Sequence, residues 1–428
     1  MRPYTLAAVV AALLLLAAGP AVAQYRIIDI DTQLGAGSYE VSNGFGINNG
    51  NQVVGHVRTW PGAEGGFMWE GGVKTRLGEQ EDRPLVRPYA INDSGFAAGY
   101  CEGLGGSGYF TRATVWDTTV RDGNDVVPAI NLGFGQTSGG GSEAYAINAS
   151  GQVVGHWHKE GSNYQGFLIT PRDDNQDGRP DVWYEDVNTD GVNDLMTNLA
   201  PAGASFSLAN DINDSGLIVG RYLDASTMGY AALWLDENTV VNLGVNPGAA
   251  TDASAINSGG CVAGGYDVYG NGATSQAFRI CPADTNEDGE GDLWFEDGNQ
   301  DGINDLMEAL GDLGGNYSEV NDINDMGIIV GSSHVAGGDS HAFAWLDEPA
   351  LGLPAETMID LNDLIGPGDP YADWVLVSAV AINEEGWIVG GMTNPTTGEH
   401  HGFLLVPEPG MFSLLALGGL ALVRRRRR

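Results

Sequence analysis

The sequence predicts an all-β protein, a seven-bladed β-propeller built from four-stranded repeats. Three recurring segments support this fold. The first is a nine-residue segment that begins with Ile-Asn, continues through small polar residues to Gly, and ends in apolar residues and a second Gly. The second is an apolar segment with an aromatic residue, and the third is a strand end with Leu or Leu-Gly. Each occurs seven times, and the shortest unit of 44 residues has the length of one propeller blade.

The nine-residue segment has the local chemistry of a β-hairpin. Its copies begin at Ile47, Ile91, Ile147, Ile212, Ile256, Ile323 and Ile382. An Asn opens the turn, and the fourth residue counted from it is Gly, as in a type I turn followed by a left-handed residue. The first copy has Asn51 at this place, and Asn is the non-glycine residue that best tolerates a positive φ. We expect the closing Gly to mark a β-bulge or a close approach of two backbones.

The two ends of the repeat array predict how the ring closes. Residues 27–34 form a strand pattern with no blade in front of it, whereas the last repeat reaches residue 405 with no fourth strand behind it. An N-terminal strand that completes the last blade would pair both ends and remove the exposed sheet edge. We therefore expect a propeller over residues 24–405, in which residues 27–34 form the outer strand of the seventh blade.

The first 23 residues have the pattern of a secretory signal peptide. Arg2 precedes an apolar run over residues 6–18, and Ala21-Val22-Ala23 supplies a small-residue cleavage site. A transmembrane helix is the alternative, but this apolar run is too short to span a bilayer. We expect an exported mature chain. The net charge of −37 disfavours binding to nucleic acid and to anionic lipid.

Two acidic insertions enlarge the third and fifth repeats, at residues 172–196 and 283–307. Each contains the spacing Asp-x-Asn-x-Asp-Gly-x-x-Asp twice. Side-chain oxygens at places one, three, five and nine can surround a calcium ion, and Gly at place six permits the sharp turn. We therefore predict structural calcium at Asp173, Asn175, Asp177, Asp181, Asp186, Asn188, Asp190, Asp194, Asp284, Asn286, Asp288, Asp292, Asp297, Asn299, Asp301, Asp305 and Glu308.

The four loops resemble the first nine positions of an EF-hand loop, and their tandem offset of thirteen residues is more similar to dockerin and thrombospondin type 3 repeats. The resemblance implies calcium binding. The bidentate Glu expected at place twelve, however, is present only as Glu308, while Tyr184, Thr197 and Phe295 stand there in the other loops. Low affinity or ligands shared between loops would follow. The alternative is a pair of solvated acidic loops.

Cysteine and histidine form no catalytic pattern in the sequence. Cys261 and Cys281 lie symmetrically about Asn271, so a hairpin centred there would place them opposite each other and permit a disulfide, with Cys101 left over. Three buried thiols are the alternative. The seven His residues follow blade positions, and we interpret them as structural. A nucleophile elbow, a zinc motif and a phosphate loop are all missing from the sequence, and we assign no catalytic residue.

Residues 406–428 have the order of a sorting signal. They combine Pro407-Glu408-Pro409, an apolar run over residues 411–423 and five terminal Arg residues. This order resembles the PEP-CTERM signal of Gram-negative bacteria, whose members are handled by an exosortase. The resemblance implies transient anchoring in the inner membrane, sorting by an exosortase-type enzyme, and a final location at the cell surface or outside the cell. A permanent tail anchor is the alternative.

The paired repeats are similar to the HAF family of extracellular repeats, as in His341-Ala342-Phe343. The resemblance covers nearly all of the mature chain and implies an extracellular location. We expect a non-enzymatic surface or extracellular-matrix protein whose calcium-stiffened insertions present a binding face to exopolysaccharide or to a partner protein. The alternative is a polysaccharide-acting enzyme, a hydrolase or lyase, with carboxylates in the central channel. Unequal polar residues in the channel would favour the enzyme, and a lining that is similar in all seven repeats would favour the binding protein.

Overall fold

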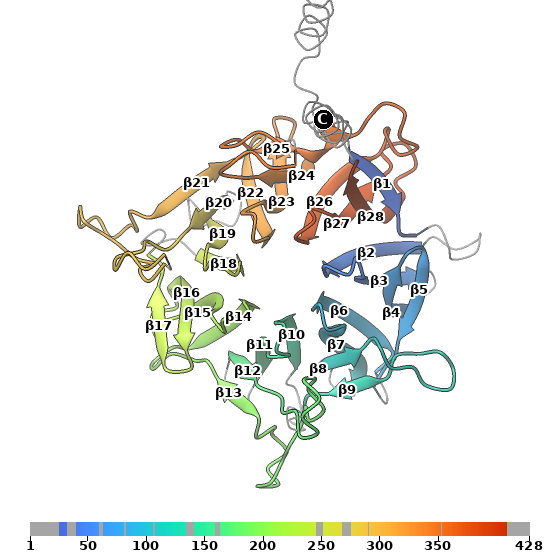
Figure 1. Cartoon of the computed structure of the whole chain (residues 1–428), viewed down its shortest axis with the longest axis vertical. Helices are drawn as coiled ribbons and strands as arrows, with labels where there is room; N and C mark the ends of the chain where they lie inside the picture. The colour runs from blue at the N-terminus through green and yellow to red at the C-terminus, as the bar shows by residue number, and fades with distance from the viewer. Residues whose placement is uncertain are drawn as a thin grey trace, which may run out of the picture.

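Seven four-stranded antiparallel sheets surround a central axis, so the chain is a seven-bladed β-propeller, as the repeats predict (Figure 1). This description comes from a computed structural model. The structure describes residues 25–31, 40–59, 63–80, 83–105, 108–133, 141–158, 163–244, 251–267, 275–289, 291–351 and 353–408. The predicted signal peptide and residues 409–428 of the predicted sorting tail lie outside these ranges. Within these ranges, no helix has the length and apolar character needed to cross a membrane.

Each blade has its first strand at the channel and its last strand at the rim (Figure 1). Blade 1 contains β2 (Glu40–Ile47), β3 (Val53–Thr59), β4 (Ala63–Glu70) and β5 (Val73–Leu77), and blade 2 contains β6 (Leu85–Ile91), β7 (Phe96–Gly105), β8 (Gly108–Asp117) and β9 (Ala129–Asn131). Blade 3 contains β10 (Ser142–Ile147), β11 (Val153–His158), β12 (Tyr164–Ile169) and β13 (Met196–Asn198), and blade 4 contains β14 (Phe206–Ile212), β15 (Ile218–Leu223), β16 (Gly229–Asp236) and β17 (Thr239–Asn242). Blade 5 contains β18 (Thr251–Ile256), β19 (Val262–Asp267), β20 (Ser275–Ile280) and β21 (Met307–Gly311). Blade 6 contains β22 (Gly314–Ile323), β23 (Ile329–Val335), β24 (Ser340–Trp345) and β25 (Ile359–Asp360), followed by the 3₁₀ turn η1 (Leu361–Leu364). Blade 7 contains β26 (Val375–Ile382), β27 (Ile388–Thr393), β28 (His400–Pro407) and β1 (Tyr25–Asp29).

The ring closes through the N-terminal strand, as expected. β1 pairs with β28 from Tyr25 opposite Pro407 to Asp29 opposite Phe403, so the first strand of the chain is the outer strand of the last blade. The strand covers residues 25–29 rather than the predicted 27–34. Tyr25 and Ile27 are buried in the core between blades 6 and 7 because they pack under η1 and β28.

The repeated turn has the conformation that its sequence predicts. Asn51 has a φ of 60°, and the Gly at the same place in the other copies also has a positive φ, for example 79° at Gly95. The backbone N–H of Asn51 donates to the carbonyl of Asn48 over 3.0 Å, which closes the turn. The substitution of Gly by Asn in the first copy is therefore tolerated because Asn adopts the left-handed conformation.

The closing Gly of each repeat lies where two backbones approach closely. A Cβ at this position would be 1.9–2.2 Å from a carbonyl oxygen of the partner strand in all seven copies, at Gly55, Gly99, Gly155, Gly220, Gly264, Gly331 and Gly390. The register of the inner strand shifts by one residue next to each of these glycines, as between Ala144 and Ala146. The repeated Gly thus accompanies a β-bulge in every blade and also lies at a close approach of two backbones, so both features predicted for it are confirmed.

The seven turn asparagines form a closed ring of hydrogen bonds. Each side-chain amide donates to the backbone carbonyl of the equivalent Asn in the next blade over 2.8–3.2 Å, and the last one donates back to the first. Each side-chain oxygen accepts the N–H of the fourth residue onward in its own blade. We call this set the asparagine ring; it comprises Asn48, Asn92, Asn148, Asn213, Asn257, Asn324 and Asn383, all 2–7% exposed.

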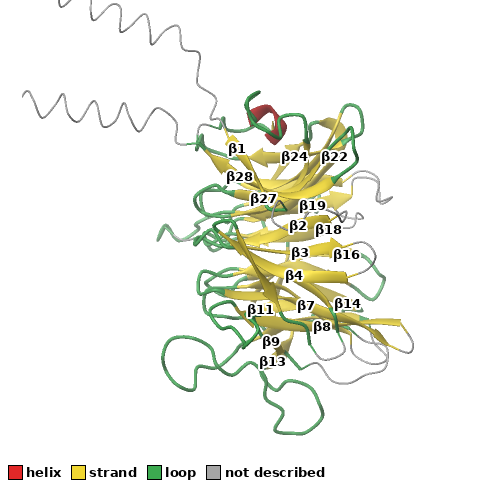
Figure 2. Cartoon of the chain, turned by 90° about the vertical axis from the view of Figure 1, so that its right-hand side faces the viewer, coloured by secondary structure: helices red, strands yellow, loops and turns green. Residues whose placement is uncertain are grey.

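The predicted insertions and disulfide also have a place in this fold. Residues 172–196 and 283–307 lie between the third and fourth strands of blades 3 and 5, and they project outward from the rim (Figure 1). The insertion before β13 forms two lobes (Figure 2). β19 and β20 form a hairpin in which Val262 faces Ile280, and Cys261 and Cys281 are bonded immediately beyond this pair. Cys101 is a buried free thiol.

Candidate functional site in the central channel

The bulges place one extra residue of every inner strand in the channel. We call this set the bulge residues; it comprises Phe45, Tyr89, Tyr145, Asn210, Ser254, Asn321 and Val380. All seven line a cavity of about 200 Å³ on the axis of the propeller. All seven are partly exposed, although the strands around them are mostly buried. A repeated structural feature, the bulge, therefore presents seven side chains to one shared cavity.

Aromatic rings form one half of the cavity wall. Phe45 and Tyr89 meet edge to face with 5.5 Å between ring centres, and Tyr89 and Tyr145 are 5.6 Å apart. His56 stacks behind Phe45 at 5.1 Å, and Tyr100 lies 5.5 Å from Tyr89. These contacts fix the orientation of the rings, so blades 1 to 3 present a continuous aromatic surface.

Two carboxyl groups stand in the other half of the wall, on blades 4 and 6. Asp211 accepts the N–H of Ile212 in its own strand over 2.8 Å and that of Ile256 in the next blade over 2.9 Å. Asp322 accepts the N–H of Ile323 and of Ile382, each over 2.8 Å. Both carboxyl groups therefore join neighbouring blades and also line the cavity.

The surroundings of the two carboxyl groups raise their pKa values. Burial raises the pKa of Asp211 to about 6, against the hydrogen bonds from Ile256 and Ile212, which lower it. Burial, followed by the charge of Asp211, raises the pKa of Asp322 to about 8. Desolvation disfavours the charged form of a carboxyl group, and a second carboxylate nearby disfavours it further. These surroundings therefore favour the protonated form of Asp322 more strongly than that of Asp211.

Amide groups complete the polar half of the wall. Asn210 donates to the carboxylate of Asp252 over 2.7 Å and to the carbonyl of Ala253 over 2.9 Å. Asn321, at the same place in blade 6, donates to the carbonyl of Ala379 over 2.6 Å. These bonds fix the amide groups and leave their oxygens as acceptors at the cavity. The lining thus differs between blades, with rings on blades 1 to 3 and with amides and carboxyl groups on blades 4 and 6.

The sequence did not single out these residues, yet it contains a signal for them. When the seven repeats are aligned on their Ile, the second residue before it differs between copies, although the closing Gly and the Asn are the same in all. Asp211 and Asp322 stand where the other copies have Gly or Ala. Polar or aromatic departures within an otherwise uniform repeat would have indicated the channel as the candidate site.

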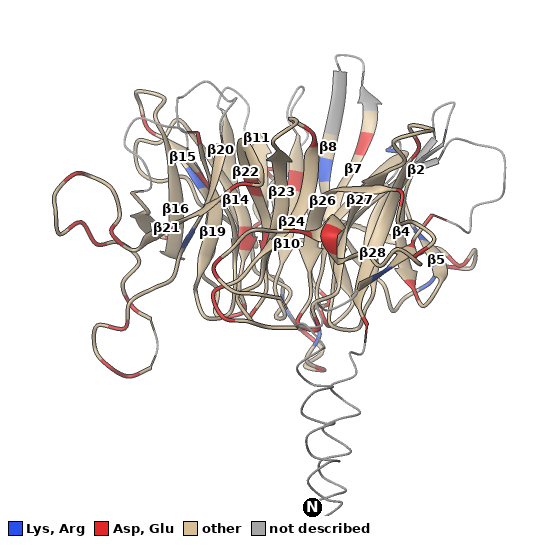
Figure 3. Ribbon diagram, turned by 90° about the horizontal axis from the view of Figure 1, so that it is seen from above, with Lys and Arg blue, Asp and Glu red and all other residues tan. Residues whose placement is uncertain are grey.

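All of the predicted calcium ligands except Glu308 lie in the rim insertions, away from the cavity. Figure 3 shows acid-rich loops beside β21. Each loop winds around its own side chains. The carboxylate at place one accepts the N–H of the Gly at place six, as from Gly178 to Asp173 over 2.8 Å, and the same bond recurs in the other three loops. The carboxylate at place nine accepts the N–H of place two, as from Asp174 to Asp181 over 3.0 Å. Calcium in these loops stays a prediction.

Two acidic residues in or next to the insertions have partners in the protein. Glu308, the predicted place-twelve ligand, lies on β21 and forms an ion pair with Arg279 over 2.7 Å. Glu185 forms an ion pair with Arg172. Arg279 also contacts Asp347 over 2.9 Å and lies over the ring of Trp345. Glu308 therefore has a structural role in blade 5 that the motif alone did not reveal.

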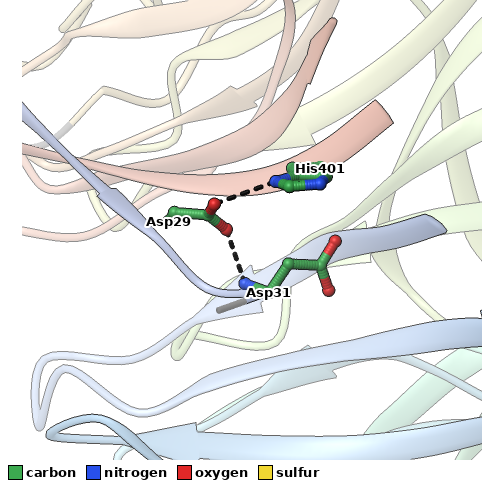
Figure 4. Close-up of side chains that lie close together, drawn as sticks. All are labelled: Asp29, Asp31 and His401. Atoms are coloured by element: carbon green, nitrogen blue, oxygen red, sulfur yellow. Dashed lines mark hydrogen bonds and ion pairs between the residues drawn. The ribbon is translucent and has the colours of Figure 1, made fainter. Parts of the chain in front are cut away.

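A second cluster that could hold a metal lies at the ring closure (Figure 4). Among the described residues, the ligand atoms of Asp29, Asp31 and His401 lie within 4.8 Å of one another. The Nδ1 atom of His401 is 2.8 Å from Asp29, and Lys74 of blade 1 is 3.4 Å from Asp31. The hydrogen bond with Asp29 raises the pKa of His401. These contacts join the closing strand to β28 and to the first blade, so they account for the cluster as an ion-pair network.

The chain has distant similarity to known structures. No protein-family model and no curated protein matches the chain. A mutant Aleuria aurantia lectin in complex with alpha-methyl-L-fucoside is 10% identical, with a TM-score of 0.33, over 73% of this chain and 93% of the lectin. The complex of that lectin with Fucalpha1-6GlcNAc gives 11% identity and the same coverage and TM-score. Trypanosoma rangeli sialidase in complex with the inhibitor DANA is 9% identical, with a TM-score of 0.35, over 92% of this chain and 56% of the sialidase. Similarity this low carries no argument about function.

Proposed function

We propose that this chain is a non-enzymatic saccharide-binding propeller of the cell surface or extracellular matrix, which holds part of an exopolysaccharide in its central channel. The observation that carries the proposal is the cavity wall, in which aromatic rings face amide and carboxyl groups. The apolar faces of a sugar ring pack on aromatic side chains. Its hydroxyl groups form hydrogen bonds with amides and carboxylates. Tyr89 and Tyr145 supply the first kind of contact, and Asn210, Asn321 and Asp211 supply the second.

The size of the cavity limits the part of a saccharide that can enter. Its volume of about 200 Å³ is smaller than the roughly 300–1,000 Å³ of ordinary small-molecule pockets. A single ring or a chain end fits this space better than a long segment of polymer does. The site therefore suits recognition of a terminal or branch residue.

A polysaccharide-acting enzyme is the second candidate function, and one observation favours it. The channel lining is unequal, as we expected of the enzyme, and the pKa values of about 6 for Asp211 and about 8 for Asp322 differ as those of a general base and a general acid do. Binding is preferred because both oxygens of each carboxyl group hold backbone N–H groups of two blades. Two such bonds give each carboxyl group a fixed structural role.

Export and sorting belong to the same proposal. A signal peptide at residues 1–23 and the motif Pro407-Glu408-Pro409 support handling by an exosortase-type enzyme, with transient retention in the inner membrane. A chain that ends at Val406 should then be secreted in soluble form. Recovery of this shortened chain in the membrane fraction would contradict the sorting proposal.

The binding proposal is tested on the purified domain of residues 24–408 with a glycan array and a parallel reducing-sugar assay. We expect binding to a subset of glycans without release of reducing ends. Tyr89→Ala should reduce binding at least tenfold, whereas Tyr184→Ala, which removes a 42%-exposed Tyr from an insertion, should not. Release of reducing ends that is lost in both Asp211→Asn and Asp322→Asn would establish the enzyme instead, and an array without any bound glycan would contradict both functions.

A further inference from the structure

The described lining of the cavity contains acidic groups and neither Lys nor Arg. Among the described side chains of the inner and second strands, the Lys and Arg residues are Arg87 and Arg221. Both lie over rings, at 5.9 Å from the centre of Tyr100 and 5.3 Å from the centre of Phe206. Arg221 is also 3.9 Å from Asp252. The carboxyl groups of Asp211 and Asp322 therefore meet no cation within the cavity.

The opposite wall is also suited to a cation. The faces of aromatic rings carry partial negative charge and attract an ammonium group placed over them. Phe45, Tyr89 and Tyr145 form a continuous surface with centre-to-centre spacings of 5.5 and 5.6 Å. A small group that enters the cavity thus meets aromatic rings on one side and carboxyl groups on the other.

We propose that the saccharide group bound in the channel carries a positive charge, as the free ammonium group of an amino sugar does. This inference rests on the proposed saccharide-binding function and names the chemical class of its ligand. The ammonium group pairs with Asp322 and Asp211, while the ring or chain that carries it packs on Tyr89 and Tyr145. Acidic sugars are excluded because their carboxylates would meet two carboxyl groups and no compensating cation.

Binding of a cation has a consequence for the proton on Asp322. The charged or titratable groups around this residue are Asp211 on β14 and Glu384 after β26, with Tyr89 and Tyr145 on the far wall. None of these groups compensates a negative charge at Asp322, and its pKa is raised to about 8. A bound ammonium group does compensate this charge. Asp322 then ionises, and its proton leaves to the solvent when the ligand binds.

The test uses three matched probes, the β-1,4-linked dimers of glucosamine, N-acetylglucosamine and glucose. We expect calorimetry of the 24–408 domain at pH 7 to show at least tenfold tighter binding of the glucosamine dimer than of the other two. Measurements in buffers of different ionisation enthalpy should show proton release for that dimer alone. Its affinity should rise about tenfold from pH 6 to pH 7. In this range, which lies below the pKa of Asp322, binding of the ammonium group requires Asp322 to release one proton, and this release becomes easier as the pH rises.

Variants separate the channel from the overall negative charge of the protein. Asp322→Asn should reduce the preference for the glucosamine dimer to within twofold and abolish proton release. Asp363→Asn removes the same charge from an exposed position of η1 and should change neither result. Should Asp322→Asn fold poorly, Tyr89→Leu provides the second variant, with an expected tenfold loss of affinity. Equal or tighter binding of the acetylated or neutral dimer, or no binding of any dimer, would overturn the inference; the saccharide-binding proposal fails only when the wider array is negative as well.

Discussion

The asparagine ring and the bulge residues lie three positions apart in each repeat, the bulge residue in the inner strand and the Asn in the turn that follows it, yet they follow opposite rules. The ring has the same residue and the same two kinds of hydrogen bond in every blade. The bulge residues include two Tyr, two Asn, one Phe, one Ser and one Val. This repeat therefore keeps the residues that join blades the same, while the residues that face the cavity differ from blade to blade. The positions that differ between the seven repeats are therefore the candidates for function.

Deletion of the closing strand β1 should have the largest effect on the contacts that join the blades into a ring. A chain that starts at Tyr39 lacks β1 and exposes the edge of β28. It also loses Tyr25, Ile27 and Ile30, which are 1–7% exposed. At about 1.5–3 kcal/mol for each of these three buried side chains, we expect roughly 4.5–9 kcal/mol of lost stability, with aggregation. Thermal unfolding and gel filtration measure both effects, and an unchanged melting temperature would show that the ring does not need this strand.

A substitution within the asparagine ring should have the next largest effect. Asn148→Ala removes the bond to the carbonyl of Asn213, which is buried, and the bond from the N–H of Gln152, which is partly buried. Leaving such groups unpaired costs about 1–3 kcal/mol each, so we expect a loss of about 2–6 kcal/mol in urea unfolding. Asn238→Ala, in an exposed turn of blade 4, is the matched control. Equal stability of the two variants would mean that the ring contributes nothing.

Calcium should stabilise the rim insertions without affecting the channel. At 10 mM calcium and an affinity of about 10⁻⁴–10⁻³ M, typical of extracellular modules, we expect about 1.4–2.7 kcal/mol of added stability per site. Replacement of Asp177, Asp190, Asp288 and Asp301 by Ala should abolish the rise in melting temperature and leave glycan binding unchanged. A calorimetric titration without heat at millimolar calcium, together with a constant melting temperature, would favour solvated loops instead.

The raised pKa of Asp322 predicts a smaller, pH-dependent effect. The folded state holds this proton more tightly than the unfolded chain, so its contribution to stability falls as the pH rises from about 4, the ordinary pKa of Asp, to about 8. Between pH 5 and pH 8, we expect the melting temperature of the wild type to fall by roughly 2–4 °C more than that of Asp322→Asn. Parallel pH profiles would argue against a protonated Asp322.

The sequence predicted the turns, bulges and blades of the propeller well because these features depend on residues close together in the chain. Asn51 indicated a left-handed turn, the closing Gly indicated a bulge, and Cys261 and Cys281 indicated the register of one hairpin; the structure confirms all three. The channel site could not be derived in the same way. Tyr89 and Asp322 lie 233 positions apart, and only closure of the ring brings them to one cavity. The partner of Glu308 was missed for the same reason, since Arg279 lies on the neighbouring strand.

The assignment of function to the channel is tested most directly by hydrogen–deuterium exchange of the 24–408 domain with and without the glycan that ranks highest on the array. Binding in the channel predicts slower exchange on addition of ligand at residues 43–47, 87–91 and 143–147, which carry the aromatic wall, and at residues 210–212 and 321–323. The rim insertions at residues 172–196 and 283–307 should exchange at the same rate in both samples. Protection confined to the insertions, with no change along the inner strands, would contradict the account and place binding at the rim.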